Sequence, residues 1–116
     1  MITLYGIANC DTVKKARAWL VEHGQAYEFH DFKKSSVPPQ QLTQWIHAVG
    51  WEKLLNRQGT TWRKLSTEEQ AAVHDAASAQ ALMLAHPSVI KRPVVNWGDS
   101  ITVGFNAAAW LDKTGR

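Results

Sequence analysis

The first 32 residues contain a strand, a helix and a second strand with very short connections, and this arrangement limits the folds open to the chain. Residues 2–7 (ITLYGI) and residues 26–32 (AYEFHDF) alternate and are rich in strand-forming side chains. The helix between them has its apolar residues at helical spacing, namely Val13, Ala16, Trp19 and Leu20. Strands joined by a helix usually pair in parallel through a right-handed crossover, so we expect a parallel pair here.

The ends of this helix carry recognisable signals. Asn9 or Asp11 is expected to cap its start, because short polar side chains accept hydrogen bonds from the first free amides. Gly24 is expected to end it, since glycine tolerates the backbone conformation that closes a helix.

The middle of the chain has helical signals and no convincing strand. Prolines at a helix entry and Gly50 at its exit frame one helix. Ser66 and Glu69 have the spacing of a capping box, and a further helix stops before Pro87. We therefore expect residues 35–86 to form a helical insert.

Strand signals return in residues 92–97 and 101–105, where the Gly-Asp-Ser turn between them predicts a hairpin, and residues 106–115 read as a closing helix. The order is β-α-β, a helical block, then β-β-α. At 116 residues the chain is long enough for one domain. The sequence thus predicts an α/β fold, a single thioredoxin-like domain over residues 1–116 whose mixed sheet is interrupted by the insert.

Composition argues against several classes of protein. No apolar run approaches the roughly 20 residues of a membrane span, and the N-terminus lacks the pattern of a signal peptide. The net charge of +3 is mild and the basic residues are scattered, which favours a solvated surface over a nucleic-acid site. The five histidines lack metal-ligand spacing. We expect a cytoplasmic monomer without metal, membrane or nucleic-acid partner.

Cys10 is the single cysteine, and it lies at the junction of the first strand and the helix. There the amides of Thr12 and Val13 and the positive end of the helix favour the thiolate, and Lys14 and Lys15 add positive charge. A thiolate is the form that attacks a disulfide or another electrophilic centre. The alternative is a small buried side chain, which the polar neighbours of Cys10 disfavour.

Val13 stands where a second cysteine would complete a CxxC pair, so Cys10 has no local partner. Any disulfide must join Cys10 to another molecule. Glutathione is the natural co-substrate in a reducing compartment, and no bound cofactor is expected.

Two further stretches hold candidate site residues. Arg92 precedes Pro93 at the start of a strand, and its planar fork of donors suits a carboxylate or an oxyanion. The alternative is a surface arginine beside an ordinary trans-proline. Arg57 lies in a loop punctuated by Gly59, where arginines are usually only solvated, and the sequence alone makes it a weak candidate.

The chain resembles the arsenate reductase-like (ArsC/Spx/YffB) family, and most closely its YffB branch, in four segments that occur in the same order: TLYGIANCDTVKKARAWL, LLNRQGTTWRKL, DAASAQALMLAHPSVIKRPVV and VGF. The resemblance implies a thioredoxin-like fold and a cis peptide bond at Pro93. It also implies that Cys10 is the catalytic nucleophile and that Arg92 binds the oxyanion. Arg57 lies at or one residue from a second arginine of the arsenate reductases, and Lys14 stands at a basic position of the cysteine loop.

This chain departs from the arsenate reductases at three positions. Gly6 replaces the histidine upstream of their cysteine, Val13 replaces a serine, and Gly104 lies near their third arginine. Val13 also removes the CxxC switch of many Spx regulators.

The sequence therefore predicts an enzyme, a glutathione-dependent thiol–disulfide oxidoreductase. Its catalytic residue would be Cys10, with Thr12, Lys14, Arg57, Arg92 and Pro93 as the substrate and glutathione site. Glutathione, a small oxyanion or a disulfide-bearing protein would be its partner. The alternatives are an arsenate reductase with a reduced oxyanion site, and a non-catalytic, Spx-like regulator that binds RNA polymerase. Arg92 is expected to orient the ligand, while the helix end activates the thiol.

Overall fold

The computed structural model describes residues 2–114, which divide into two compact units. The first unit contains the N-terminal segment up to Ser35 and resumes at Arg92, and the second unit is Ser36–Lys91. No helix within the described residues is long and apolar enough to cross a membrane.

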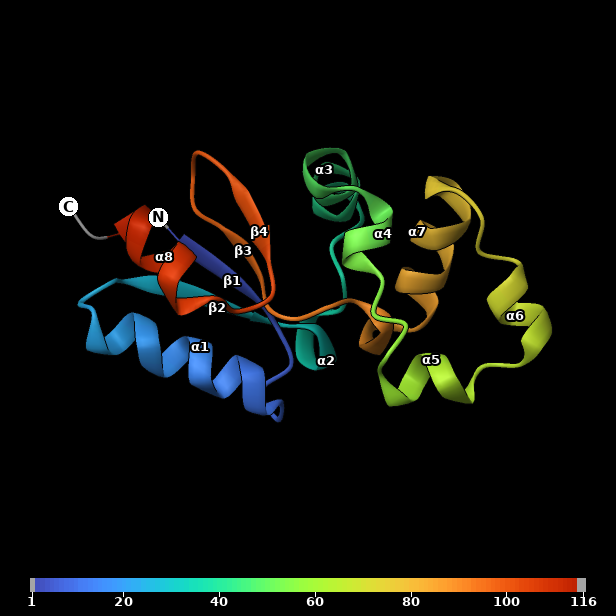
Figure 1. Ribbon diagram of the computed structural model, residues 1–116, viewed down its shortest axis with the longest axis horizontal. Helices are drawn as coiled ribbons and strands as arrows, with labels where there is room; N and C mark the ends of the chain where they lie inside the picture. Colours follow the sequence, from blue (N-terminus) through green and yellow to red (C-terminus); the bar gives the residue numbers. More distant parts are fainter. Residues whose placement is uncertain (1, 115–116) are drawn as a thin grey trace. The chain divides into compact units, whose positions relative to one another are not determined.

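A mixed four-stranded sheet forms the centre of the first unit (Figure 1). Its strands run in the spatial order β2 (Tyr27–Asp31), β1 (Ile2–Gly6), β3 (Val94–Asn96) and β4 (Ile101–Val103). Strand β1 pairs in parallel with β2 and antiparallel with β3, and β3 and β4 form an antiparallel hairpin. The predicted parallel pair, the hairpin and the α/β fold class are confirmed.

Helices α1 (Asp11–Glu22) and α8 (Ala107–Thr114) supply the apolar partners of this sheet. One cluster of buried side chains joins them to β1 and β3, and its members are Leu4, Val13, Ala16, Trp19, Leu20, Val95 and Trp110. All four residues predicted for the apolar face of α1 belong to this cluster, so the helical periodicity located that face correctly.

Two local predictions in this unit were wrong. The N-cap of α1 is Cys10 rather than Asn9 or Asp11, and no side chain caps the helix. The second strand ends at Asp31, because a short helix, α2 (Phe32–Ser35), follows at once. The Asp31 carboxylate accepts a hydrogen bond from the Lys33 amide at 2.9 Å, and burial of Phe32 fixes the turn.

The second unit consists of short helices. They are α3 (Pro39–Val49), α4 (Trp51–Leu54), α5 (Thr60–Lys64), α6 (Thr67–Ala71), α7 (Ala76–Ala85) and the 3-10 turn η1 (Pro87–Val89). The predicted capping box of Ser66 and Glu69 is present, with hydrogen bonds of 3.1 and 3.0 Å. A second box, in which Asp75 and Ser78 take part, starts α7. The sequence did not predict α5 as a helix.

Two extended segments are clamped together inside the second unit. Leu55 and Ile90 form an antiparallel bridge. The Asn56 amide donates to the Val89 carbonyl and the Lys91 amide to the Leu54 carbonyl, both at 2.7 Å. Because Leu54, Leu55, Val89 and Ile90 are all buried, this clamp is held by packing as well as by hydrogen bonds.

Candidate functional site

Cys10 lies at the junction between the sheet and α1, as the sequence predicts. It is the N-cap residue, in extended backbone conformation, and its own carbonyl accepts the first helical hydrogen bond from Lys14 at 2.9 Å. Its side chain is half-buried and packs against the apolar cluster of the first unit. The thiol is therefore neither a fully buried core group nor a freely solvated one.

The surroundings of the sulfur lower the pKa of Cys10 below that of an ordinary thiol. Burial alone raises this pKa, because it disfavours the charged thiolate. The Val13 amide, the Arg92 guanidinium and the Thr12 amide outweigh burial, since each stabilises negative charge on sulfur. The pKa of Cys10 is thus shifted in the direction expected from the sequence, toward the thiolate.

The cation that acts on the sulfur is Arg92. Its side chain stabilises the Cys10 thiolate both through a hydrogen bond and through its charge. Lys14 and Lys15, which the sequence suggested as sources of positive charge, are exposed on the first turns of α1. The sequence predicts that Arg92 orients the ligand, and in the structure Arg92 also lowers the pKa of the Cys10 thiol.

The sheet topology explains how Arg92 reaches Cys10 across 82 positions of sequence. Arg92 lies immediately before β3, and β3 pairs with β1, whose C-terminal end leads into the loop that carries Cys10. Arg92 is half-buried and Pro93 is buried. The peptide bond between them is cis, as the resemblance implied.

The other predicted site residues, Thr12, Lys14 and Arg57, do not all belong to the same unit as Cys10. Thr12 contributes its backbone amide, while its side chain and that of Lys14 are exposed. Arg57 belongs to the second unit and is also exposed. Its guanidinium lies 5.7 Å from the ring centre of Trp51 and 5.9 Å from that of Trp62. A role for Arg57, for Lys14 or for the Thr12 side chain in ligand binding stays a prediction.

The backbone accounts for a glycine at position 104, near which the resemblance places the third arginine of the arsenate reductases. The φ of Gly104 is +84°, in the region that favours glycine, and its amide donates to the Pro93 carbonyl at 2.8 Å. An arginine at this position would adopt a strained backbone.

Comparison with known proteins places this site in a family. The ArsC family matches residues 5–113, which is nearly the whole chain. The chain belongs to the ArsC family.

Two solved structures extend the similarity of this ArsC-family chain across its length. The YffB protein is 47% identical, with a TM-score of 0.93, over 98% of this chain and 99% of that one. A protein from Brucella melitensis described as related to an arsenate reductase (ArsC) is 50% identical, with a TM-score of 0.75, over 96% of this chain and 92% of that one. The predicted family membership is confirmed.

A regulator is among the relatives. The global transcriptional regulator Spx of Streptococcus agalactiae is 29% identical over 91% of this chain and 77% of its own length. This chain is thus similar both to a protein described as related to an arsenate reductase and to a protein named as a transcriptional regulator.

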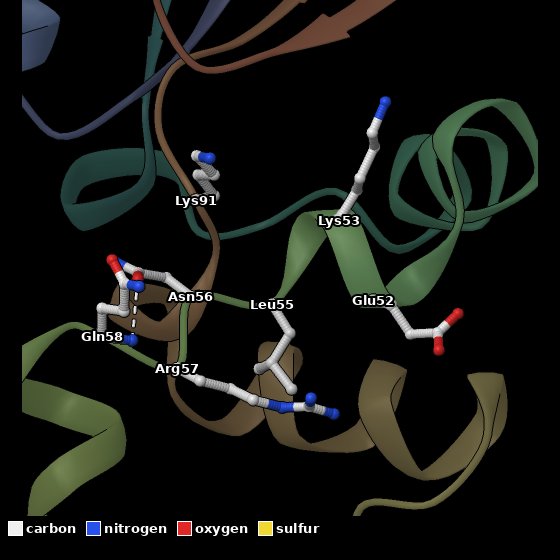
Figure 2. Close-up of a pocket in the computed structure, with 7 residues that line it drawn as sticks. All are labelled: Glu52, Lys53, Leu55, Asn56, Arg57, Gln58 and Lys91. Carbon is white, nitrogen blue, oxygen red and sulfur yellow. Dashed lines mark hydrogen bonds between the residues drawn. The ribbon is translucent and has the colours of Figure 1, made fainter.

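Sequence reasoning missed one set of polar residues. A pocket in the second unit is lined by Lys53, Asn56, Gln58 and Lys91, among others (Figure 2). Lys91 lies 38 positions from Lys53 in the chain. The clamp of Leu55 and Ile90 brings the two segments together, and no local pattern signals such a pairing.

Proposed function

We propose that this ArsC-family chain is a glutathione-dependent thiol–disulfide oxidoreductase that uses Cys10 as its nucleophile. The observation that carries the proposal is the contact of Arg92 and two helix-end amides with the Cys10 sulfur, which lowers the pKa of the thiol. A lowered pKa increases the thiolate fraction near neutral pH, and the thiolate is the reactive species. The half-buried position leaves the sulfur open to a small disulfide.

The proposed cycle has three exchange steps. The Cys10 thiolate attacks one sulfur of a disulfide RS–SR′, forming Cys10–S–S–R and releasing R′S⁻. A glutathione thiolate then attacks the Cys10 sulfur, forming Cys10–S–S–glutathione and releasing RS⁻. A second glutathione thiolate attacks the glutathione sulfur of this adduct, which restores the Cys10 thiolate and releases glutathione disulfide. One disulfide is reduced and two glutathione molecules are oxidised.

The absence of a second cysteine favours glutathione as the reductant. With Val13 at the CxxC position and no other cysteine in the chain, no internal thiol can resolve the adduct. An external thiol must do so, and glutathione is abundant in a reducing cytoplasm. In this proposal Arg92 has two roles, since it stabilises the thiolate and offers its planar fork to a carboxylate of the incoming peptide.

A coupled assay tests the proposed function. Reduction of a small disulfide by glutathione is followed through NADPH consumption by added glutathione reductase, with the wild-type chain and Cys10→Ser. We expect rate acceleration that depends on both glutathione and Cys10. Equal rates for the two proteins would refute the proposal. The exposed Arg63, in the second unit, supplies a matched control variant, Arg63→Gln, which should retain activity.

Arsenate reduction is the second candidate, favoured by the contact between Arg92 and the sulfur and by the similarity to the arsenate reductase-related protein of Brucella melitensis. Attack of Cys10 on arsenate would form a Cys10–S–As bond and release water. A glutathione thiolate would then attack the Cys10 sulfur and break the S–As bond, whose electron pair stays on arsenic, so that As(III) leaves while the Cys10 and glutathione thiols are together oxidised to a disulfide. Glutathione-dependent formation of arsenite, absent in Cys10→Ser, would support this activity. The resemblance places the third arginine of the arsenate reductases near Gly104, where the positive φ favours glycine over arginine, and this makes arsenate reduction the weaker candidate.

A further inference from the structure

A polar pocket in the second unit is not used by the chemistry of Cys10. It encloses about 310 Å³, which is at the lower end of the size of small-molecule sites. Three cationic side chains and one carboxylate line it, so their net charge is +2. These residues are Lys53, Arg57, Lys91 and Glu52.

These three cations lack an acidic partner within the described part of the chain, since no ion pair in residues 2–114 joins Lys53, Arg57 or Lys91 to a carboxylate. The ammonium groups of Lys53 and Lys91 extend from α4 and from the segment before β3, toward the same side of the close-up (Figure 2). Three cations gathered beside a single carboxylate repel one another, and a bound anion would relieve that repulsion.

The backbone beneath these side chains is held firmly. The Asn56 amide and the Lys91 amide make the two 2.7 Å hydrogen bonds of the clamp, so Lys91 is fixed against the end of α4. Leu55, which also lines the pocket, is 5% exposed and anchors the clamp in the apolar core of the unit. The pocket therefore has a preformed floor, which reduces the entropy lost when a ligand binds.

The polar side chains are also restrained. The Asn56 side-chain oxygen accepts a hydrogen bond from the Gln58 amide at 3.1 Å, seen as the dashed line in Figure 2. Its amide nitrogen packs against Gly59, where an added Cβ would lie only 2.8 Å away. Trp51 and Trp62 flank the Arg57 guanidinium and hold it by cation–π contact.

We propose that this pocket binds a small organic or inorganic dianion, with Lys53 and Lys91 as the principal charged contacts. The net charge of +2 on the lining residues would be neutralised by a ligand with two negative charges. The carboxylate of Glu52 would repel a ligand that carried further negative charge. The two charges could be carried by one phosphate or by the two carboxylates of a dicarboxylate, which share this chemistry. The proposal does not depend on the reactivity of Cys10.

Titration of the ¹⁵N-labelled full chain tests the proposal, with glutarate, inorganic phosphate and acetate as probes at constant ionic strength. Glutarate or phosphate should saturate shifts of the Asn56, Gln58 and Lys91 amides, while acetate binds more weakly. If only glutarate saturates these shifts, the ligand has two separate acidic groups. If only phosphate does, the ligand carries its charge on one compact group. Failure of both to bind, or equal affinity for acetate, would overturn the proposal.

Variants separate this pocket from general charge effects. The double variant Lys53→Gln/Lys91→Gln should weaken binding of the effective probe by about 3- to 10-fold, as expected when two partly exposed charge contacts are lost. Lys64→Gln removes an exposed lysine of the same unit that does not line the pocket, and it should leave the affinity unchanged. Equal weakening by Lys64→Gln and by the double variant would overturn the assignment. Without ligand, the amides of residues away from the pocket should have the same chemical shifts in the double variant as in the wild type, which shows that the variant is folded.

Discussion

Gly6 and Val13, two of the positions at which this chain departs from the arsenate reductases, lie in direct contact. A Cβ atom built on Gly6 would lie 2.8 Å from one γ-methyl group of Val13, closer than real Cβ contacts allow. Val13 is fully buried, so it has little room to move away. The glycine where the resemblance expects a histidine and the valine where it expects a serine are therefore one coupled feature of the packing.

This contact predicts non-additive effects on stability. Gly6→Ala should lower the free energy of unfolding by about 1–3 kcal/mol, because it overpacks the junction of β1 and α1. In a Val13→Ala background the same substitution should cost less, with a coupling of about 0.5–3 kcal/mol. Urea denaturation of the four proteins of this cycle measures the coupling. A Gly6→Ala cost that is identical in both backgrounds would show that the contact is unimportant.

Arg92 should control the acidity of Cys10. Arg92→Gln removes the hydrogen bond and the charge that stabilise the thiolate, so the pKa of Cys10 should rise. Arg92→Lys keeps the charge but loses the planar fork, and its pKa should fall between those of the wild type and Arg92→Gln. The rate of iodoacetamide alkylation against pH gives each value. Arg63→Gln is the control, and a midpoint that is the same in all four proteins would contradict the assigned role of Arg92.

The same lowered pKa predicts how stability changes with pH. The folded chain releases the Cys10 proton at lower pH than the unfolded chain, whose thiol has a pKa of about 8.5. The stabilising contribution is therefore fully present above the unfolded pKa and is lost as pH falls through the folded pKa. The difference in unfolding free energy between wild type and Cys10→Ser should shrink as pH falls from 9.5 to 6. A difference that is constant over this range would exclude the linkage.

Trp110 should be a main support of the first unit. It is 1% exposed, and its ring meets those of Trp97 and Phe105 edge-on at 5.0 and 4.8 Å. Trp110→Ala should lower the free energy of unfolding by about 3–5 kcal/mol, as removal of a buried aromatic side chain usually does. Leu111→Ala, at a neighbour that is 50% exposed, should change it by less than about 1 kcal/mol. Similar losses for the two variants would contradict the packing described for α8.

Most long-range features of the first unit could be predicted from the sequence, because they follow from repeated local patterns. The helical spacing of Val13 and Leu20 predicts the buried face of α1, and the β-α-β order predicts the parallel pairing of β1 with β2. Strand β3, which follows Pro93, pairs with β1, and this pairing brings Arg92 to Cys10.

Short elements and side-chain contacts escaped prediction for physical reasons. Helices α2 and α5 have four and five residues, which is too few for a periodic apolar face; α2 buries only Phe32 and α5 buries no residue. The pocket of Lys53 and Lys91 depends on a bridge between distant segments. The role of Arg92 in lowering the thiol pKa depends on a side-chain direction that sequence spacing does not encode.

Cys10 is expected to pass through a glutathione adduct during turnover, and rapid quenching followed by mass spectrometry detects that adduct. The native chain is mixed with a small disulfide and glutathione, quenched with acid at successive times, and its intact mass is measured. We expect one glutathione adduct per chain at Cys10 that forms and decays at the turnover rate, and none in Cys10→Ser. A native chain that turns over without any adduct, or that is modified only after unfolding, would contradict the proposed cycle.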